Sequence, residues 1–208
     1  MFLFDISCNK TYIPFYIQDL QIAEFPLLQL HKMKRFSSHI HPLFFFIFVV
    51  LLLIDHSSAK PTELVDKVCN RTSDYAFCVN SLYSDPRTSN ADSYTLAYIS
   101  FGLAYLNATA SHDNILNLLN KPSGASHERL KICEQDYGKA TLALEQSFND
   151  LNSETFFTLP ELANHGARAA SDCQAAFAGS SCNPLSEMNM NLKGLCGICV
   201  VVSELFTG

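Results

Sequence analysis

Residues 185–206 read LSEMNMNLKGLCGICVVVSELF, and the spacing of their apolar side chains decides the fold class. The residues Asn183-Pro184 come directly before this stretch and combine a good N-cap residue with proline at the first helical position. Apolar positions then recur at alternating spacings of three and four, which is the pattern of a helix that packs against other helices. They are Leu185, Met188, Leu192, Leu195, Cys199, Val202 and Phe206.

Three segments before this one carry similar rows of apolar residues along one helix face, which we call seams. Connections at 121–124, 152–153 and 179–181 are short, so consecutive helices are expected to be antiparallel neighbours. The sequence therefore predicts an all-α fold, with an up-and-down four-helix bundle over residues 88–207. A shift of register near residues 111–113 predicts a kink or a stutter in the first bundle helix. The residues Thr158-Leu159-Pro160-Glu161 have the pattern of a capping box at the start of the third bundle helix, so an irregular or 3₁₀ segment is expected over residues 154–158. The seams are Leu96, Ile99, Leu103, Leu106 and Ala110; Leu130, Cys133, Tyr137, Ala140, Leu144, Phe148 and Leu151; and Leu162, Gly166, Ala169, Cys173 and Ala176.

Two pairs of cysteines fit this architecture as disulfides. Residues 62–85 hold two apolar patches that are too short to be stable helices alone, and a bridge between Cys69 and Cys78 would hold them as a helical hairpin. Cys133 and Cys173 lie at equal distances from residue 153, the predicted turn between the second and third bundle helices. Residues equidistant from such a turn lie at the same height, so a cross-helix disulfide is geometrically natural there.

The segment before the hairpin has the features of a secretory signal. Residues 43–54 form an apolar run without charge, too short to cross a bilayer but typical of a signal peptide. A signal over residues 33–59, cleaved between Ala59 and Lys60, leaves residues 60–208 as the mature domain. We interpret residues 1–32 as an extension that is not part of the native protein, with translation beginning at Met33. The alternative is a signal anchor that stays in the membrane.

Charge and composition exclude some functions for the mature domain. Residues 60–208 contain 16 acidic residues against 10 Lys and Arg, so no basic surface is available to neutralise nucleic-acid phosphates. An acidic domain suits secretion and an electropositive protein partner. On the secretory route the sequons at Asn70 and Asn107 are expected to accept N-glycans.

Cysteines outside the two pairs are expected to behave differently from one another. Cys196 and Cys199 form a CxxC without the strand that a thioredoxin-like site requires, and Cys199 lies on the helix seam, where burial is expected. Cys182 comes before that helix, too far from either of them for a disulfide. We therefore expect Cys182 to be a free thiol or to bridge two chains in a dimer.

Catalytic and metal-binding patterns are weak in this sequence. His112, His127 and His165 lie in polar or small-residue contexts without metal-ligand spacing. No phosphate-binding glycine loop and no nucleophile elbow occur, and the acidic residues are scattered along helix faces. The sequence therefore predicts a protein that is not an enzyme and binds neither cofactor nor metal.

Four cysteines with their neighbours resemble the plant invertase/pectin methylesterase inhibitor family. The resemblance rests on Val68-Cys69, Tyr75-Ala76-Phe77-Cys78, residues 81–87, residues 130–137 and residues 169–177, and it extends over residues 62–206. Its nearest branch is that of the pollen-allergen-like invertase inhibitors. The resemblance implies a hairpin followed by a four-helix bundle, with the disulfides Cys69–Cys78 and Cys133–Cys173. It also implies a secreted, apoplastic inhibitor that blocks the cleft of a pectin methylesterase or an acid invertase, mainly through the second and third bundle helices.

One departure from the family concerns the turn between these two helices. Invertase-blocking members carry Pro-Lys-Phe there, whereas this chain has Ser153 followed by the candidate partner contacts Glu154, Thr155, Phe156 and Phe157. The missing lysine argues against the known mode of invertase inhibition. Two alternatives stay open, a non-inhibitory structural or allergen-like bundle and a small carrier of hydrophobic ligands.

Overall fold

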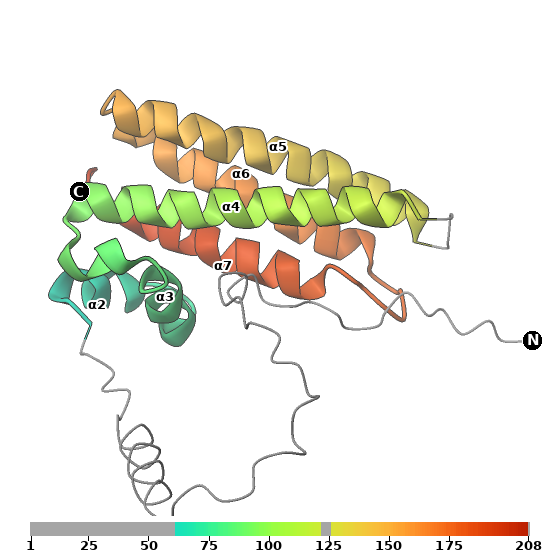
Figure 1. The fold of residues 1–208 in the computed structure, drawn as a ribbon, viewed down its shortest axis with the longest axis horizontal. Coiled ribbons are helices and arrows are strands. Elements are labelled where there is room, and N and C mark those ends of the chain that lie inside the picture. Colours follow the sequence, from blue (N-terminus) through green and yellow to red (C-terminus); the bar gives the residue numbers. More distant parts are fainter. Residues whose placement is uncertain (1–60, 122–125, 208) are drawn as a thin grey trace, which may run out of the picture. The chain divides into compact units, whose positions relative to one another are not determined.

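The computed structural model describes residues 61–121 and 126–207, and this part of the chain is helical without strands. Four long helices lie side by side (Figure 1): α4 (Ser93–Leu119), α5 (His127–Asn152), α6 (Leu159–Ala176) and α7 (Ser186–Ser203). The predicted all-α bundle is therefore confirmed. The expected extension over 1–32, the signal over 33–59 and its cleavage site at Ala59 and Lys60 lie outside the described residues.

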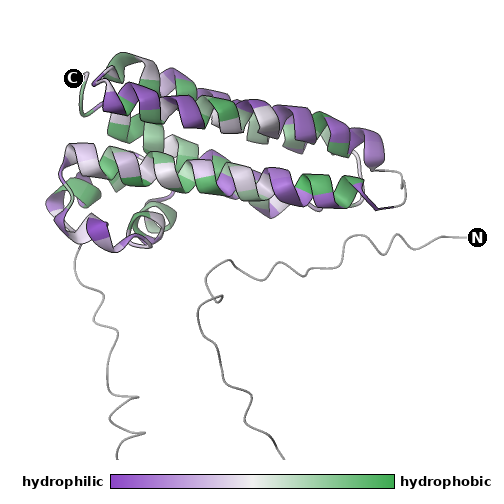
Figure 2. Cartoon of the chain, turned by 45° about the horizontal axis from the view of Figure 1, so that its top comes forward, coloured by the Kyte–Doolittle hydropathy of each residue, from purple (hydrophilic) through white to green (hydrophobic). Residues whose placement is uncertain are grey.

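The four helices form a closed ring of antiparallel neighbours. α5 packs between α4 and α6, and α7 closes the ring by packing on both α6 and α4. The diagonal pair α4 and α6 makes only a small contact. Each helix therefore presents one stripe to a shared core and another to the surface, and Figure 2 shows apolar and polar residues alternating along the helices in this way.

The core positions agree with the predicted seams in α5 and α7 but only in part in α4, where Leu96 and Ile99 are buried as predicted. The seam of α7 from Leu185 to Val202 is buried, whereas Leu106, which was placed on the seam of α4, is 65% exposed. The true seam of α4 keeps its heptad spacing through the expected register shift, so α4 is one unbroken helix and the predicted kink is wrong. Its buried members are Ala97, Phe101, Ala104, Ala108, Ser111 and Ile115.

Glycine lets α6 and α7 approach closely. A Cβ atom placed on Gly166 would lie 2.6 Å from Sγ of Cys196 on α7 and 3.4 Å from Cδ1 of Leu144 on α5. The first distance is far shorter than an ordinary contact, whereas the second is an ordinary van der Waals contact, so a side chain at residue 166 would push α6 away from α7. The small-residue seam predicted for the third bundle helix thus has a packing role.

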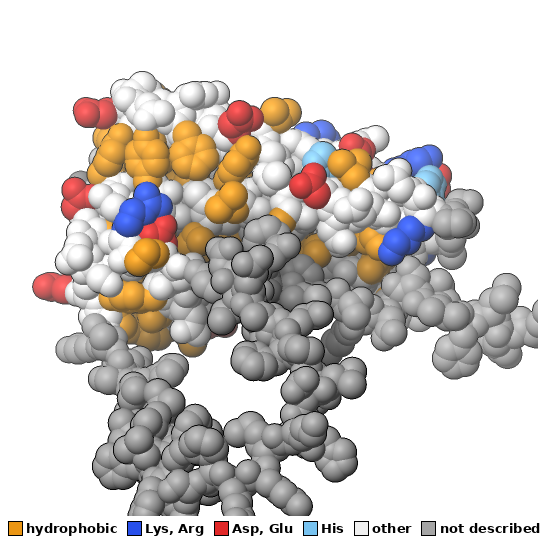
Figure 3. Space-filling model, in the orientation of Figure 1, with side chains coloured by type: hydrophobic (Ala, Val, Ile, Leu, Met, Phe, Trp, Pro, Cys, Tyr) orange, Lys and Arg blue, Asp and Glu red, His pale blue; other side chains and the backbone are white. Residues whose placement is uncertain are grey.

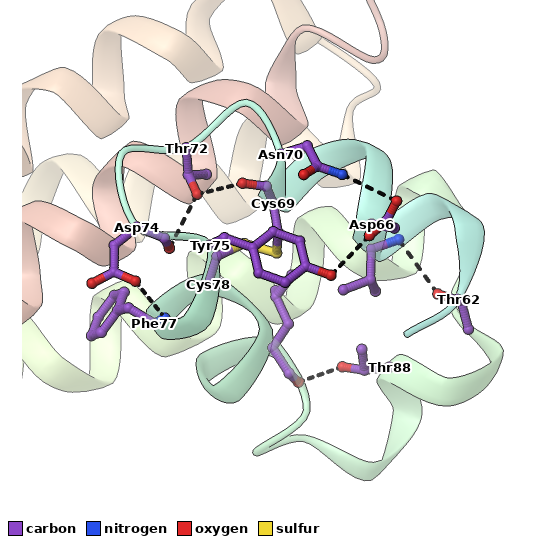
Figure 4. The surroundings of a disulfide bond; sticks show 12 residues. Thr62, Asp66, Cys69, Asn70, Thr72, Asp74, Tyr75, Phe77, Cys78 and Thr88 are labelled. Atoms are coloured by element: carbon purple, nitrogen blue, oxygen red, sulfur yellow. Dashed lines mark hydrogen bonds between the residues drawn. A yellow bond between two sulfur atoms is a disulfide. The ribbon is translucent and has the colours of Figure 1, made fainter. Parts of the chain in front are cut away.

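The hairpin before the bundle consists of α2 (Glu63–Cys69) and α3 (Tyr75–Leu82). Thr62 caps α2 by accepting from the backbone N–H of Val65, and Asp74 caps α3 by accepting from that of Phe77. The Cys69–Cys78 disulfide joins the last residue of α2 to the middle of α3, with Cα atoms 5.5 Å apart (Figure 4). Each helix has only two turns, so the caps and the disulfide supply order that propensity alone cannot.

The hairpin rests on the edge of the bundle formed by α4 and α7. A Cβ on Gly194 of α7 would lie 2.6 Å from the Phe77 ring, so the ring lies directly against the backbone of α7. Arg71 also forms an ion pair with Glu204 beyond the end of α7. A short 3₁₀ helix, η2 (Pro86–Asn90), then leads into α4, and its buried Thr88 hydroxyl donates to the carbonyl of Leu82.

Two helix starts differ from the sequence-based expectation. Thr158 was expected to cap α6, but its hydroxyl donates to the carboxylate of Asp150 on α5, and the cap position makes no side-chain bond to the helix. Asn183 was expected to cap α7, but its side chain accepts from the N–H of Leu185 in a turn, and α7 begins at Ser186. The irregular segment predicted before α6 is present as η3 (Phe156–Thr158).

No helix in the ranges 61–121 and 126–207 is both long and apolar enough to span a bilayer.

Candidate functional site

The turn between α5 and α6 has an unusual backbone conformation. The N–H of Thr155 donates to the carbonyl of Asp150 at 2.8 Å, and the N–H of Glu154 donates to that of Leu151 at 3.1 Å. These bonds are those of a Schellman motif, in which the residue after the cap adopts a left-handed conformation and is usually glycine. Here that residue is Glu154, with φ of 55°. A left-handed non-glycine residue costs about 1–2 kcal/mol, so the turn holds an acidic side chain at an energetic cost.

Aromatic contacts fix the segment that follows. The ring of Phe156 stacks on that of Phe206 with centroids 4.3 Å apart, and it meets the ring of Tyr94 edge-on at 6.3 Å. Phe157 points away from this cluster and is 76% exposed. An exposed phenylalanine on a well-anchored turn loses little freedom on binding, which suits an anchor for a partner.

Further rings continue from this cluster along the junction of α4 and α5. Tyr94 contacts Tyr98, Tyr98 contacts Phe148, and Phe148 contacts Tyr105, with centroid separations of 5.2, 6.0 and 5.8 Å. Figure 3 shows a row of hydrophobic side chains on this part of the surface. The hydroxyls of Tyr94 and Tyr98 donate to Leu151 and Asn152 at the end of α5. The rings therefore hold the end of α5, and with it the turn, in a fixed position relative to α4.

The second disulfide links the two helices on either side of the turn. Cys133 of α5 and Cys173 of α6 are buried and joined, with Cα atoms 4.6 Å apart. Both disulfides of the predicted fold are thus present. With Gly166 allowing α6 close to its neighbours, this bridge makes the α5–α6 pair a rigid unit, and the turn is its tip.

The outer surface of this pair is acidic. Lys131, Lys139 and Arg168 each pair with an acidic residue of their own helix, at 3.1, 3.8 and 2.7 Å. The bond from Arg168 lowers the pKa of Glu161. Burial raises the pKa of Asp136, with Lys139 opposing the shift and the nearby Asp172 adding to it. These cations are therefore already engaged by carboxylates, and other carboxylates of the two helices remain for an electropositive partner.

Exposed apolar and amide side chains run along the outer face of α5. Ile132 and Leu142 are 49% and 67% exposed, and exposed Gln and Asn residues lie between and beyond them. Their spacing of three and four residues places them on one stripe of the helix. The stripe consists of Ile132, Gln135, Lys139, Leu142, Gln146 and Asn149. Apolar anchors surrounded by hydrogen-bonding groups are what a protein-binding surface needs.

The cysteines of the CxxC are free and buried in α7. Burial raises the pKa of Cys196 to about 12 and that of Cys199 well above its usual value, so neither forms a thiolate at neutral pH. Cys182 is disulfide-bonded. It is therefore not a free thiol, which was one of the two states expected from the sequence. Whether Cys182 ever links two chains stays a prediction.

The remaining chemistry of the described segments gives no catalytic centre. No three His, Cys, Asp or Glu side chains there are arranged to hold a metal ion. Nε2 of His112 on α4 lies 3.7 Å from Oε1 of Glu134 on α5. Nε2 of His165 lies 3.2 Å from Oε1 of Glu161, and both residues are on α6. The arrangement can therefore bind a partner through shape and charge, but it shows no paired acid and base with a nucleophile.

The structure brings the four predicted contact residues together in one turn but gives them different roles. Glu154 and Phe157 are exposed, whereas Thr155 and Phe156 are partly buried and hold the turn. Sequence reasoning missed Tyr94 and Phe206, which lie far away in the chain and support Phe156. Phe206 was predicted as a seam residue, and only the antiparallel arrangement of the helices brings it to this end of the bundle.

Comparison with known proteins agrees with this architecture. A solved structure described as a mutant form A of a pectin methylesterase inhibitor from Arabidopsis matches with a TM-score of 0.64 at 19% identity, over 69% of this chain and 97% of the other. The pectinesterase inhibitor of Actinidia deliciosa is 28% identical over 174 residues, which are 80% of this chain and 94% of that protein. The cell wall/vacuolar inhibitor of fructosidase 2 of Arabidopsis thaliana is 32% identical over 119 residues, 53% of this chain and 66% of that protein.

The family model described as plant invertase/pectin methylesterase inhibitor matches residues 63–202, which include both disulfides, the hairpin and nearly all of the bundle. Members of this family inhibit enzymes and are not catalysts themselves. The chain therefore belongs to the plant invertase/pectin methylesterase inhibitor family.

Proposed function

We propose that this chain is a secreted inhibitor of a pectin methylesterase and that it docks through the outer face of α5 and α6 and the turn that joins them. The observation that carries the proposal is the strained turn, in which Glu154 takes the place of the usual glycine next to the exposed Phe157. Backbone strain of this kind is concentrated at functional sites, where the side chain is needed for another reason. A role in partner binding supplies that reason.

The charge of the turn favours one target class over the other. An acid invertase is a glycoside hydrolase, and such enzymes place two carboxylates around the bond they cleave. A carboxylate at Glu154 would meet them with like charge, whereas the lysine of the invertase-blocking turn would be attracted. A pectin methylesterase binds a chain that becomes a polyanion as its esters are hydrolysed, so its cleft must accept carboxylates.

Inhibition of an acid invertase is the second candidate. It is favoured by the similarity to the fructosidase inhibitor of Arabidopsis thaliana, which extends over 119 residues. The two candidates make opposite predictions for the charge at residue 154, so a substitution there discriminates between them.

The test is to secrete the full-length chain from plant cells, purify it, and titrate it against a pectin methylesterase and an acid invertase at the mildly acidic pH of the cell wall. We expect stoichiometric loss of methanol release and no loss of sucrose hydrolysis. Retention of full esterase activity at saturating inhibitor would contradict the proposal. A folded protein that inhibits neither enzyme would favour the non-inhibitory alternative, and displacement of a fluorescent apolar dye would then test the carrier alternative.

Variants of the turn locate the contact. Phe157→Ala should weaken inhibition about tenfold or more, the range expected for an exposed aromatic anchor. Leu106→Ala is the matched control, because Leu106 is 65% exposed on α4, outside α5 and α6. Equal inhibition by the parent and both variants would exclude the turn from the interface.

Glu154→Gly separates strain from function. Because glycine adopts the left-handed conformation without penalty, we expect the free energy of unfolding to rise by about 1 kcal/mol. We also expect inhibition of the esterase to weaken, because the carboxylate is lost. A variant that is more stable and inhibits equally well would show that Glu154 does not contact the enzyme.

A further inference from the structure

The carboxylate of Asp150, in the last turn of α5, lies where the outer stripe of α5 meets the turn to α6. Its Oδ1 accepts from Nε2 of Gln146 at 3.0 Å, and Gln146 belongs to the stripe. Its Oδ2 accepts from the hydroxyl of Thr158, at the end of the turn. The two oxygens therefore bond neutral donors from both parts of the proposed docking surface.

The backbone of Asp150 holds the same turn. Its carbonyl accepts from the N–H of Thr155 at 2.8 Å, in the Schellman motif that contains Glu154. The hydroxyl of Thr158 also lies 3.1 Å from the carbonyl of Thr155. The turn is thus attached to one residue of α5 through both its main chain and its side chain.

The two side-chain bonds of Asp150 differ in strength. The bond from Gln146 is exposed, and a pair of this kind four residues apart contributes little to a helix. The bond from Thr158 is partly buried and has a charged acceptor, so it is the stronger of the two. It also joins residues eight positions apart, across the turn. It is therefore the contact that can fix the turn relative to α5.

Helix formation alone does not explain an acid at residue 150. The last turn of α5 has no basic residue, and a negative charge there faces the negative end of the helix dipole. Aspartate is also a poorer helix former than alanine. What Asp150 supplies is the bond across the turn, to the residue that directly follows the exposed Phe157.

We propose that Asp150 is a positioning residue for inhibition, which holds the turn so that Glu154 and Phe157 meet the enzyme in one orientation. The proposal rests on the proposed function, in which this turn docks. A turn that is ordered beforehand loses little freedom when the complex forms. Without the bond, only a fraction of the molecules would present the turn correctly, and the apparent affinity would fall in proportion to that fraction.

The experiment compares Asp150→Ala, Thr158→Val and the double variant, each made as the full-length chain secreted from plant cells. Asp150→Ala should weaken inhibition of a pectin methylesterase about tenfold, mainly through slower association, because the enzyme itself holds the turn once bound. Thr158→Val removes the same bond and should have a similar effect, and the double variant should be no weaker than Asp150→Ala. Asp113→Ala is the matched control, because it removes an exposed acid from α4, outside α5 and α6.

Asp150→Asn separates geometry from charge. Its side-chain oxygen can still accept from Gln146, and its amide can donate to the Thr158 hydroxyl, which can rotate to donate to Thr155. We therefore expect this variant to inhibit nearly as well as the parent. If Asp150 acted on the enzyme through its charge, Asp150→Asn would be as weak as Asp150→Ala, and this result would overturn the proposal.

Amide hydrogen exchange, followed by NMR, measures the turn without the enzyme. In Asp150→Ala the N–H groups of Glu154 and Thr155 should exchange faster, whereas the urea midpoint of the bundle should change little, because alanine favours the helix. Unchanged exchange, or faster exchange with unchanged inhibition, would refute the positioning role. A parent protein that inhibits neither enzyme would refute the proposed function and the role of Asp150 in inhibition with it, whereas the exchange rates would still decide whether Asp150 orders the turn.

Discussion

Substitution of Gly166 by alanine tests whether close approach of α6 and α7 holds the bundle together. The added Cβ would lie 2.6 Å from Sγ of Cys196, about 1 Å inside an ordinary contact. Overpacking of this kind costs about 1–3 kcal/mol, whereas replacing glycine within a helix stabilises it by about 1 kcal/mol. We therefore expect the free energy of unfolding of Gly166→Ala to lie about 1–3 kcal/mol below that of a glycine-to-alanine variant without a clash.

Gly197 supplies that reference within the partner helix. It is exposed on α7, and a Cβ there would meet nothing within 4 Å. Gly197→Ala should therefore raise stability by about 1 kcal/mol. The two variants share the gain in helix propensity, so the difference between them measures the clash alone.

A double-mutant cycle assigns the clash to one pair of atoms. Cys196→Ala removes Sγ, so Gly166→Ala in that background should behave like Gly197→Ala, with only a light contact to Leu144 remaining. The coupling energy should be about 1–3 kcal/mol, measured by urea unfolding followed by far-UV circular dichroism with both disulfides intact. Equal stability of Gly166→Ala and Gly197→Ala, or a coupling energy near zero, would refute the argument.

Three further predictions follow from the disulfides, the buried thiols and one helix cap. Removing the Cys133–Cys173 bridge with a double alanine variant should lower the free energy of unfolding in urea by about 4 kcal/mol, against about 2.6 kcal/mol for Cys69–Cys78. The first bridge closes a loop of 40 residues and the second one of 9. A reversed order would contradict the loop-entropy reasoning. Cys196 and Cys199 should not react with an aromatic disulfide reagent at mildly alkaline pH until the protein is unfolded, because burial raises the pKa of both thiols. Rapid labelling of either thiol in the folded protein would contradict this prediction. The bond from the N–H of Thr95 lowers the pKa of Asp92. The Asp92 carboxylate therefore stabilises α4 above the pKa that this residue has in the unfolded chain, and the contribution disappears as the pH falls through its lower pKa in the folded protein. The melting temperatures of the parent and Asp92→Asn should differ at neutral pH and converge in acid.

The bundle could be predicted from sequence because heptad spacing reports helix packing directly. In α5 and α7 the large apolar residues are also the buried ones, so counting them locates the core. In α4 the core positions are mostly alanine and serine, whereas Leu106 points to solvent. The expected kink came from following the leucines, although the small residues keep their spacing through Ser111. The seam of α4 was predicted from its large apolar residues, whereas close packing there requires small side chains.

Details that depend on tertiary partners could not be predicted in this way. Thr158 matches a local cap pattern, but its hydroxyl bonds Asp150, which comes from the preceding helix and reaches it only after the turn has formed. By contrast, the Cys133–Cys173 bridge could be predicted because an antiparallel pair converts distance from the turn into height.

The fold and the proposed target of this chain depend on different residues. The seams and the two disulfides specify the bundle, whereas Glu154 and Phe157 are exposed at the tip of α5 and α6. A glycine at residue 154 would adopt the left-handed conformation of this turn without backbone strain. The chain instead holds Glu154 in a left-handed conformation, beside an exposed Phe157 on a turn anchored by Phe156. Under the proposed function, both features are explained by what the turn contacts, because an acidic tip is better suited to a cleft that accepts carboxylates than to one that contains them.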